Sequence, residues 1–317
     1  MTGRPIGRRT LDGVLVVAKP VGPTSHDVVG LVRRLSATKR VGHGGTLDPF
    51  ASGVLPVFLG KATRLVEYHL GDRKRYRATV CFGASSTTDD LEGALTPAGT
   101  PPPTRDAVAG ALPRFRGEIA QRPPAYSAIK VAGRRAYALA RAGQSVELAP
   151  RAVTIHALEL VTWDETTPGE PVAIVDVSCS AGTYVRSLAR DLGEAVGNAG
   201  YLGALVRTAS GPFELAEAIE LEAVREAAAD GPEPLAALLR PIDAGLEMPS
   251  IAVPDAAVPA LARGQSIGVP SGVGPLRADQ PIRLVDDTGR VIAIARLAGT
   301  KLAPDKVLLD PPAGGSA

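Results

Sequence analysis

One short segment of the sequence places a carboxylate in a setting suited to catalysis. In GHGGTLDPFASG (residues 42–53), glycines and a proline surround Asp48 between two apolar stretches. Glycine lets a backbone approach a ligand closely, and loops on a rigid scaffold are where catalytic groups usually lie. Pro49 favours an extended conformation at Asp48. Asp48 could therefore act as a nucleophile or general base, the alternative being a structural turn in which it bonds its own backbone.

The sequence offers little for metal or nucleotide binding. It has four histidines and two cysteines, Cys81 and Cys179, and no ligand-spaced pair among them. We therefore predict no metal site and no disulfide framework. The chain contains neither the G-x-x-x-x-G-K-[ST] motif nor a dinucleotide fingerprint, so no cofactor is expected.

The elements around Asp48 follow from hydrophobic spacing. Residues 13–18 form an apolar strand, and a helix follows with Thr24 or Ser25 as its N-cap. After the Asp48 loop comes a buried strand at 53–59. Further strands are predicted at 75–83, 150–163, 171–180 and 201–208, and helices at 60–69, 104–112, 214–228 and 234–240. Residues 182–197 are predicted to form a turn that leads into an amphipathic helix.

The charge of the chain is unevenly distributed. The net charge of the 317 residues is +2, but residues 1–80 carry +9 and residues 211–317 carry −6. A basic first quarter favours a nucleic-acid partner, the alternative being an ordinary solvated surface on two domains. The N-terminus lacks an export signal and no apolar run is long enough to span a membrane, so we expect a cytoplasmic protein with no membrane contact.

Five long motifs resemble the TruB family of tRNA pseudouridine synthases. Besides GHGGTLDPFASGVLPVFLGKATR, they are DGVLVVAKPVGPTSHDVV (12–29), KRYRATVCFGASSTTDDLEG (74–93), RPPAYSAIKVAGRRAYALARAG (122–143), and VSCSAGTYVRSLARDLG (177–193) with YLGALVRTASGPF (201–213). They occur in order, and the resemblance covers residues 11–245.

The resemblance implies the α/β pseudouridine-synthase fold, with a mixed, mostly antiparallel sheet. We expect a catalytic domain at 1–248, with a thumb loop at about 121–144. The remainder, 249–317, departs from the fuller family pattern because it is short and acidic. We predict a small β-rich, PUA-like domain there, with a hairpin turn at Asp287-Thr288-Gly289.

The implied reaction is isomerisation of uridine 55 to pseudouridine in the tRNA T-loop. Asp48 matches the family's catalytic aspartate, which would attack C1′ or take a proton from C2′; the sequence leaves both open. Arg186 matches the arginine that pairs with it and favours the ionised form. By resemblance, Tyr76 stacks on the target base and assists loss of the C5 proton. The other matched pocket residues are Tyr184, Leu205 and His43, the last of which contacts the T-loop.

RNA contacts are expected from basic residues. The target uridine must leave its stack, at a cost of roughly a few kcal/mol, which contacts to the RNA must offset. The thumb segment combines basic residues, which can contact RNA phosphates, with aromatic residues, which can stack on bases. The predicted RNA-contacting residues are Arg122, Lys130, Arg134, Arg135 and Lys19.

The expected partner is the T-arm stem-loop of tRNA, with no obligatory protein partner and a monomeric chain. One alternative is a tRNA-folding chaperone that binds without isomerising. Another is the guide-RNA-dependent branch of the superfamily, disfavoured because the chain has no long basic terminal extension. The third is a hydrolase, which would need a second catalytic carboxyl group; we find none in the matched motifs.

Overall fold

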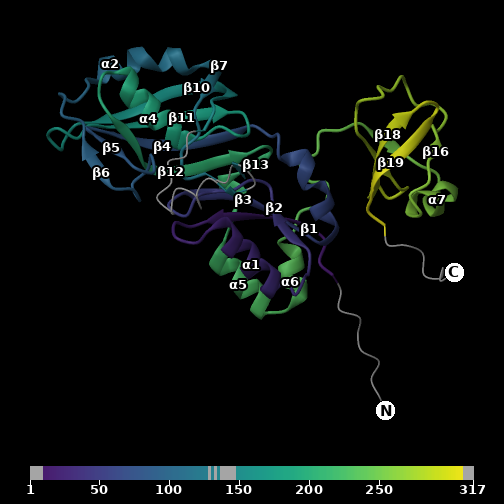
Figure 1. The fold of residues 1–317 in the computed structure, drawn as a ribbon. Coiled ribbons are helices and arrows are strands. Elements are labelled where there is room, and N and C mark those ends of the chain that lie inside the picture. The colour runs from purple at the N-terminus through teal and green to yellow at the C-terminus, as the bar shows by residue number, and fades with distance from the viewer. Residues whose placement is uncertain (1–9, 128–129, 132–133, 136–147, 310–317) are drawn as a thin grey trace.

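The computed structural model describes residues 10–127, 130–131, 134–135 and 148–309. Most strands form one mixed sheet of ten (Figure 1). They are β1 (Gly13–Lys19), β2 (Val41–His43), β3 (Ser52–Leu59), β4 (Lys74–Phe82), β7 (Gly117–Gln121), β10 (Arg151–Asp164), β11 (Val172–Cys179), β12 (Gly200–Ser210), β13 (Phe213–Glu214) and β14 (Ile219–Glu220). Only the β1–β14 and β3–β12 pairs of this sheet are parallel, so the predicted mixed, mostly antiparallel fold is confirmed.

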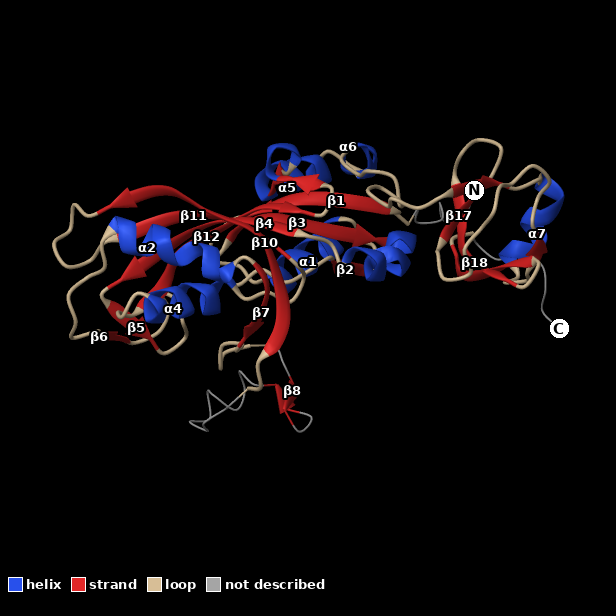
Figure 2. Cartoon of the chain, turned by 90° about the horizontal axis from the view of Figure 1, so that it is seen from above, coloured by secondary structure: helices blue, strands red, loops and turns tan. Residues whose placement is uncertain are grey.

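Helices cover the two halves of this sheet. The longer ones are α1 (Ser25–Leu35), α2 (Arg105–Ala111), α4 (Val185–Ala195), α5 (Leu221–Ala229) and α6 (Pro232–Ala237). In Figure 2, α2 and α4 lie beside β10, β11 and β12, and α1, α5 and α6 lie near β1 and β3. Two hydrophobic clusters match this division, one joining α2 and α4 to β4 and β11, the other joining α1, α5 and α6 to β1 and β3.

Shorter elements connect the strands. These are β5 (Ala84–Ser86), β6 (Leu95–Pro97), β8 (Lys130–Val131), β9 (Arg134–Arg135) and the 3-10 turns η1 (Gly60–His69), η2 (Leu112–Phe115) and η3 (Leu215–Glu217). Two predictions were inaccurate here. Residues 60–69 form a 3-10 rather than an α-helix, and the helix predicted at 214–228 begins only at Leu221, because β13 and β14 pair with the sheet first.

Gly53 lets β3 and β12 lie side by side. Its φ is +111°, and it pairs with Arg207 across the parallel strands. A Cβ atom at Gly53 would lie 2.2 Å from the Arg207 carbonyl oxygen. The contact is with backbone, which cannot turn away as a flexible side chain can, so the position requires glycine.

Gly53→Ala is therefore expected to lower the free energy of unfolding by more than about 3 kcal/mol, through both φ strain and overpacking. Gly22→Ala is the matched control, because Gly22 has the same φ of +111° but no atom within 4 Å of the position that a Cβ would take. It should lose only the strain, about 1–2 kcal/mol. Urea denaturation followed by circular dichroism measures both; equal losses would contradict this packing.

A second sheet of five strands follows the first. Its strands are β15 (Ser250–Ala252), β16 (Ile267–Gly268), β17 (Ile282–Val285), β18 (Val291–Ala298) and β19 (Lys301–Val307), with η4 (Asp255–Ala257) and α7 (Val258–Ala262) beside them. This is the predicted β-rich C-terminal domain. The change of sheet lies close to residues 248 and 249, which we retain as the proposed domain boundary.

The second sheet docks against η1 through an apolar cluster of Leu65, Leu246, Val291, Ile294 and Leu308. Ion pairs of 2.9 Å flank this cluster, between Lys306 and Glu67 and between Arg283 and Asp243. The C-terminal sheet thus helps to fix η1, the element that leads into β4.

Candidate active site

Asp48 lies in the loop between β2 and β3, and this loop is tied to the N-terminus of α1. The Ser25 hydroxyl accepts the Leu47 N–H at 2.8 Å and donates to the Leu47 carbonyl at 2.9 Å. The Asp48 side chain stays 35% exposed. The loop therefore holds a carboxylate in place while leaving it accessible to a substrate.

Arg186, in the first turn of α4, is the buried partner of Asp48. Its Nε lies 3.0 Å from an Asp48 carboxylate oxygen, and only 7% of its side chain is exposed. Nη1 and Nη2 donate to the carbonyls of Thr88 and Tyr126, at 3.2 and 3.0 Å. Because the guanidinium has several fixed acceptors, it can hold the Asp48 carboxylate in one orientation.

Asp90 is a second carboxylate at this site that the sequence did not single out. It lies 3.3 Å from Arg186 Nη1, and only 4% of its side chain is exposed. One Asp90 oxygen accepts the N–H of Glu92 at 3.0 Å and the hydroxyl of Thr88. Asp90 stands in the matched motif KRYRATVCFGASSTTDDLEG, in which the sequence indicated no second catalytic carboxyl group. Its burial nonetheless leaves Asp48 as the more accessible of the two.

Tyr76 and Tyr184 both lie within the electrostatic influence of Asp48. The Asp48 charge contributes to raising the pKa of each hydroxyl, although burial is the largest cause for both. Tyr76 is partly buried against the core beneath the site. The backbone of Tyr184 is held by the buried Gln121, which accepts its N–H at 2.8 Å and donates to its carbonyl at 3.0 Å.

Leu205 and His43 flank these groups. Leu205 is 8% exposed and packs in the cluster that contains Leu47 and Phe50 of the Asp48 loop. Nδ1 of His43 accepts the N–H of Gly45 at 3.2 Å, and burial lowers the pKa of the imidazole. His43 is thus set up as a neutral ring with its proton on Nε2.

Lys19 is buried, which corrects its place among predicted surface contacts to RNA. Its side chain is 1% exposed, and its ammonium donates to the carbonyls of Pro20, Pro23 and Pro49, at 2.8, 2.8 and 3.4 Å. Burial lowers the Lys19 pKa to about 8, while the Asp48 charge opposes this. In this arrangement Lys19 fixes the turn at Pro20–Pro23 against the Asp48 loop.

The predicted thumb lies only partly within the described residues. Arg122 is exposed, and its carbonyl accepts from Ser187 and Arg190 of α4, at 2.8 and 2.9 Å. Lys130 and Arg135 pair as backbone neighbours across β8 and β9, beside Arg134. Residues 128–129, 132–133 and 136–147 of the segment are outside the described part of the chain.

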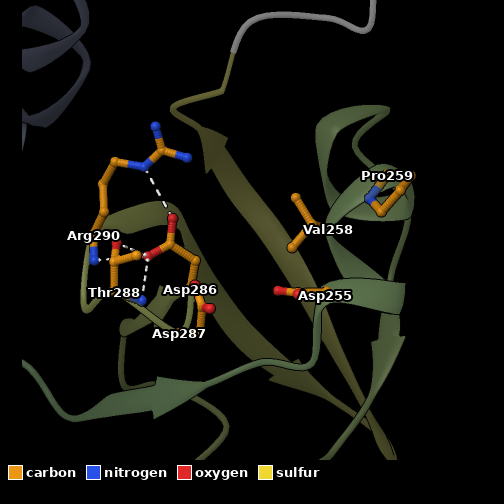
Figure 3. A pocket seen from close by; sticks show the side chains of 7 residues that line it. All are labelled: Asp255, Val258, Pro259, Asp286, Asp287, Thr288 and Arg290. Carbon is orange, nitrogen blue, oxygen red and sulfur yellow. Dashed lines mark hydrogen bonds and ion pairs between the residues drawn. The ribbon is translucent and has the colours of Figure 1, made fainter.

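A pocket in the second sheet is a separate feature. It lies between α7 and the β17–β18 turn and contains Asp255, Asp286, Asp287 and Arg290 (Figure 3). The Asp286 carboxylate accepts from Thr288 and Arg290, so it closes the hairpin loop at the predicted position, Asp287-Thr288-Gly289. The pocket's most buried acid therefore has a structural explanation.

No helix in the described part of the chain has the length and hydropathy to cross a membrane. Within the same residues, no group of three or more His, Cys, Asp or Glu side chains is arranged as a metal site. The chemistry of the Asp48 site itself is that of an accessible carboxylate, a fixed guanidinium and two tyrosines.

Comparison with known proteins places this site in a family. A family model described as TruB family pseudouridylate synthase (N-terminal domain) matches residues 33–185, and one described as tRNA pseudouridylate synthase B C-terminal domain matches residues 186–247. The tRNA pseudouridine synthase B of Bradyrhizobium diazoefficiens is 44% identical over 95% of this chain and 86% of its own length. That of Symbiobacterium thermophilum is 51% identical over 72% of this chain and 76% of its own.

Solved structures agree with this assignment. A Cbf5-Nop10-Gar1 complex contains a chain that is 27% identical, with a TM-score of 0.72, over 97% of this chain and 88% of its own. An H/ACA RNP bound to a substrate RNA containing 2′-deoxyuridine contains a chain that is 25% identical, with a TM-score of 0.72, over 98% and 89%. With Asp48 and Arg186 paired in a mixed α/β fold of this kind, the chain belongs to the TruB family of pseudouridylate synthases.

Proposed function

We propose that this protein converts uridine 55 to pseudouridine in the T-loop of tRNA, without a metal or cofactor. The observation that carries the proposal is the pair formed by the accessible Asp48 and the buried Arg186. The relatives named tRNA pseudouridine synthase B, which match most of the chain, support tRNA as the substrate.

The reaction breaks the N-glycosidic bond, rotates the base and forms a carbon–carbon bond from C5 to C1′. An ionised Asp48 can bond to C1′ or remove a proton from C2′, and Arg186 keeps the anion oriented for either step. Tyr76 and Tyr184 would contact the uracil ring. The hydroxyl pKa of each is raised mainly by burial and also by the Asp48 charge. Leu205 and His43 would complete the pocket, with His43 as a neutral hydrogen-bond donor through Nε2.

The target uridine would be flipped out of the T-loop to reach Asp48. Flipping costs roughly a few kcal/mol, so the protein must gain this energy from contacts to the surrounding RNA. We assign those contacts to Arg122, Lys130, Arg134 and Arg135 of the thumb segment. Lys19 is not among them, because its ammonium is used by three carbonyls.

A tRNA chaperone that binds without isomerising remains the alternative. The paired Asp48 and Arg186 favour a chemical role, because binding alone does not require a buried cation fixed on an accessible carboxylate. The relatives named tRNA pseudouridine synthase B are 44% and 51% identical to this chain, whereas the chains of the H/ACA RNP and Cbf5-Nop10-Gar1 structures are 25% and 27% identical to it. We therefore propose a stand-alone, monomeric, cytoplasmic enzyme.

Release of tritium from tRNA labelled at uridine C5 tests the proposal. Pseudouridine formation replaces the C5–H bond, so the protein alone should release one tritium per tRNA with no guide RNA, metal or cofactor added. A chaperone would bind the same tRNA, measured by filter retention, and release none. Binding without release would therefore overturn the isomerase assignment.

A further inference from the structure

Arg207 is a buried cation beside the Asp48 loop that has no part in the chemistry proposed for Asp48 and Arg186. It lies in β12 as the cross-strand neighbour of Tyr76 in β4, and its side chain is 1% exposed. Within the described residues it makes hydrogen bonds to carbonyl groups rather than an ion pair with a carboxylate. Burying a charged guanidinium without a carboxylate partner carries a large desolvation free energy, which a neutral side chain would avoid.

The guanidinium connects both ends of the Asp48 loop. Nη2 and Nη1 donate to the carbonyls of Gly45 and Thr46, at 3.1 and 3.2 Å, on the N-terminal side of Asp48. Nε donates to the carbonyl of Val54 at 2.7 Å, on the C-terminal side. The planar, rigid guanidinium group of Arg207 therefore fixes the backbone on both sides of Asp48.

The same guanidinium acts on Tyr76. Its charge and a side-chain hydrogen bond both lower the pKa of the Tyr76 hydroxyl, against the larger effect of burial, while Cys179 and Asp48 raise it. Burial is the largest cause of the lowered pKa values of three other basic groups, His43, Lys19 and Lys74, and the Arg207 charge lowers these pKa values further. The Arg207 guanidinium thus interacts with both the Tyr76 hydroxyl and the backbone of the Asp48 loop.

We propose that Arg207 is a positioning residue for the reaction, which holds the Tyr76 hydroxyl and the Asp48 carboxylate in a fixed relation to each other. The proposal rests on the proposed function, because it assigns both groups to one substrate. A preorganised cation stabilises charge that develops on neighbouring groups during a reaction, which a neutral residue cannot do. This role would offset the cost of burying the Arg207 charge, which a neutral side chain at this position would avoid.

Two substitutions at Arg207 separate the effect of its positive charge from the effect of the hydrogen-bond geometry of its guanidinium group. Arg207→Gln keeps hydrogen-bond donors and loses the charge, and should lower the single-turnover rate at saturating tRNA about 100-fold. Arg207→Lys keeps the positive charge but loses the guanidinium geometry. Its rate should be higher than that of Arg207→Gln and about 10-fold below that of the unaltered protein. Both should bind tRNA within about threefold of the unaltered protein, because Arg207 is not exposed.

Arg77→Gln is the matched control. Arg77 is on β4, one residue from Tyr76, but faces the opposite side of the sheet and pairs with Asp176 at 2.8 Å. Its substitution should change the rate less than about twofold, since exposed ion pairs contribute little.

A double-mutant cycle with Tyr76→Phe tests the link between the two residues. If Arg207 acts partly through the Tyr76 hydroxyl, Arg207→Gln should cost only about 10-fold in the Tyr76→Phe background, against about 100-fold alone. Additive losses, or a rate loss matched by an equal loss of tRNA affinity, would overturn the proposal.

If Arg207→Gln does not fold, the Arg207→Lys variant decides instead. An unaltered rate in this variant would contradict the proposal, and a reduced rate with unchanged tRNA affinity would support it. An unaltered protein that makes no pseudouridine would instead contradict the proposed function.

Discussion

Replacing Asp48 with asparagine is expected to abolish pseudouridine formation while leaving tRNA binding intact. Asparagine keeps the shape of the side chain, so the loop held by Ser25 should not change. It carries no charge, however, and can neither bond to C1′ nor remove a proton from C2′. We expect the single-turnover rate to fall at least about 10⁴-fold, or about 5.5 kcal/mol of transition-state stabilisation.

The same substitution at Asp176 is the control for Asp48→Asn. Asp176 also pairs with an arginine, Arg77, but on the solvent-facing side of β11, with 44% of its side chain exposed. Asp176→Asn should leave the rate within about twofold, because an exposed ion pair contributes little. Turnover retained in Asp48→Asn would contradict the central role given to this carboxylate.

Arg186→Met is expected to impair both stability and rate. The substitution leaves Asp90 buried without its cation, together with the carbonyls of Thr88 and Tyr126. Removing one partner of a buried ion pair costs about 3–5 kcal/mol, so thermal unfolding should shift clearly downwards. The Asp48 carboxylate would also lose its orientation, and we expect the single-turnover rate to fall about 10³-fold.

Arg186→Lys distinguishes charge from geometry at this position. Lysine keeps the charge, but a single ammonium group cannot reach the acceptors that the three guanidinium nitrogens share. The rate should therefore remain about 10²-fold below that of the unaltered protein. Arg77→Met, which removes only an exposed ion pair, should leave the thermal unfolding temperature almost unchanged. Full activity in Arg186→Lys would show that the observed geometry is not required.

Much of the fold was predictable because local signals agree with tertiary contacts. Thr24 or Ser25 was expected to cap a helix, and Thr24 forms a capping box with Asp27 at the start of α1. The helix predicted at 214–228 failed because sheet pairing at Phe213 and Ile219 took precedence over the helical propensity of this stretch. Such pairing depends on distant strands, so sequence spacing within one window does not show it.

The site was only partly predictable. The motifs that contain Asp48 and Arg186 were recognisable, and the structure pairs the two side chains. Asp90 was overlooked because it stands in a polar turn whose approach to α4 depends on the folded sheet. Lys19 and Arg207 are cations buried by contacts with carbonyl groups, and the identity of a basic residue does not reveal whether it faces solvent.

The most direct test is to incubate the protein alone with an unmodified tRNA transcript and map pseudouridine at each position. We predict one modified position, uridine 55 of the T-loop, with none formed by the Asp48→Asn variant. Absence of pseudouridine, modification at another position, or a requirement for a guide RNA would contradict the proposed function.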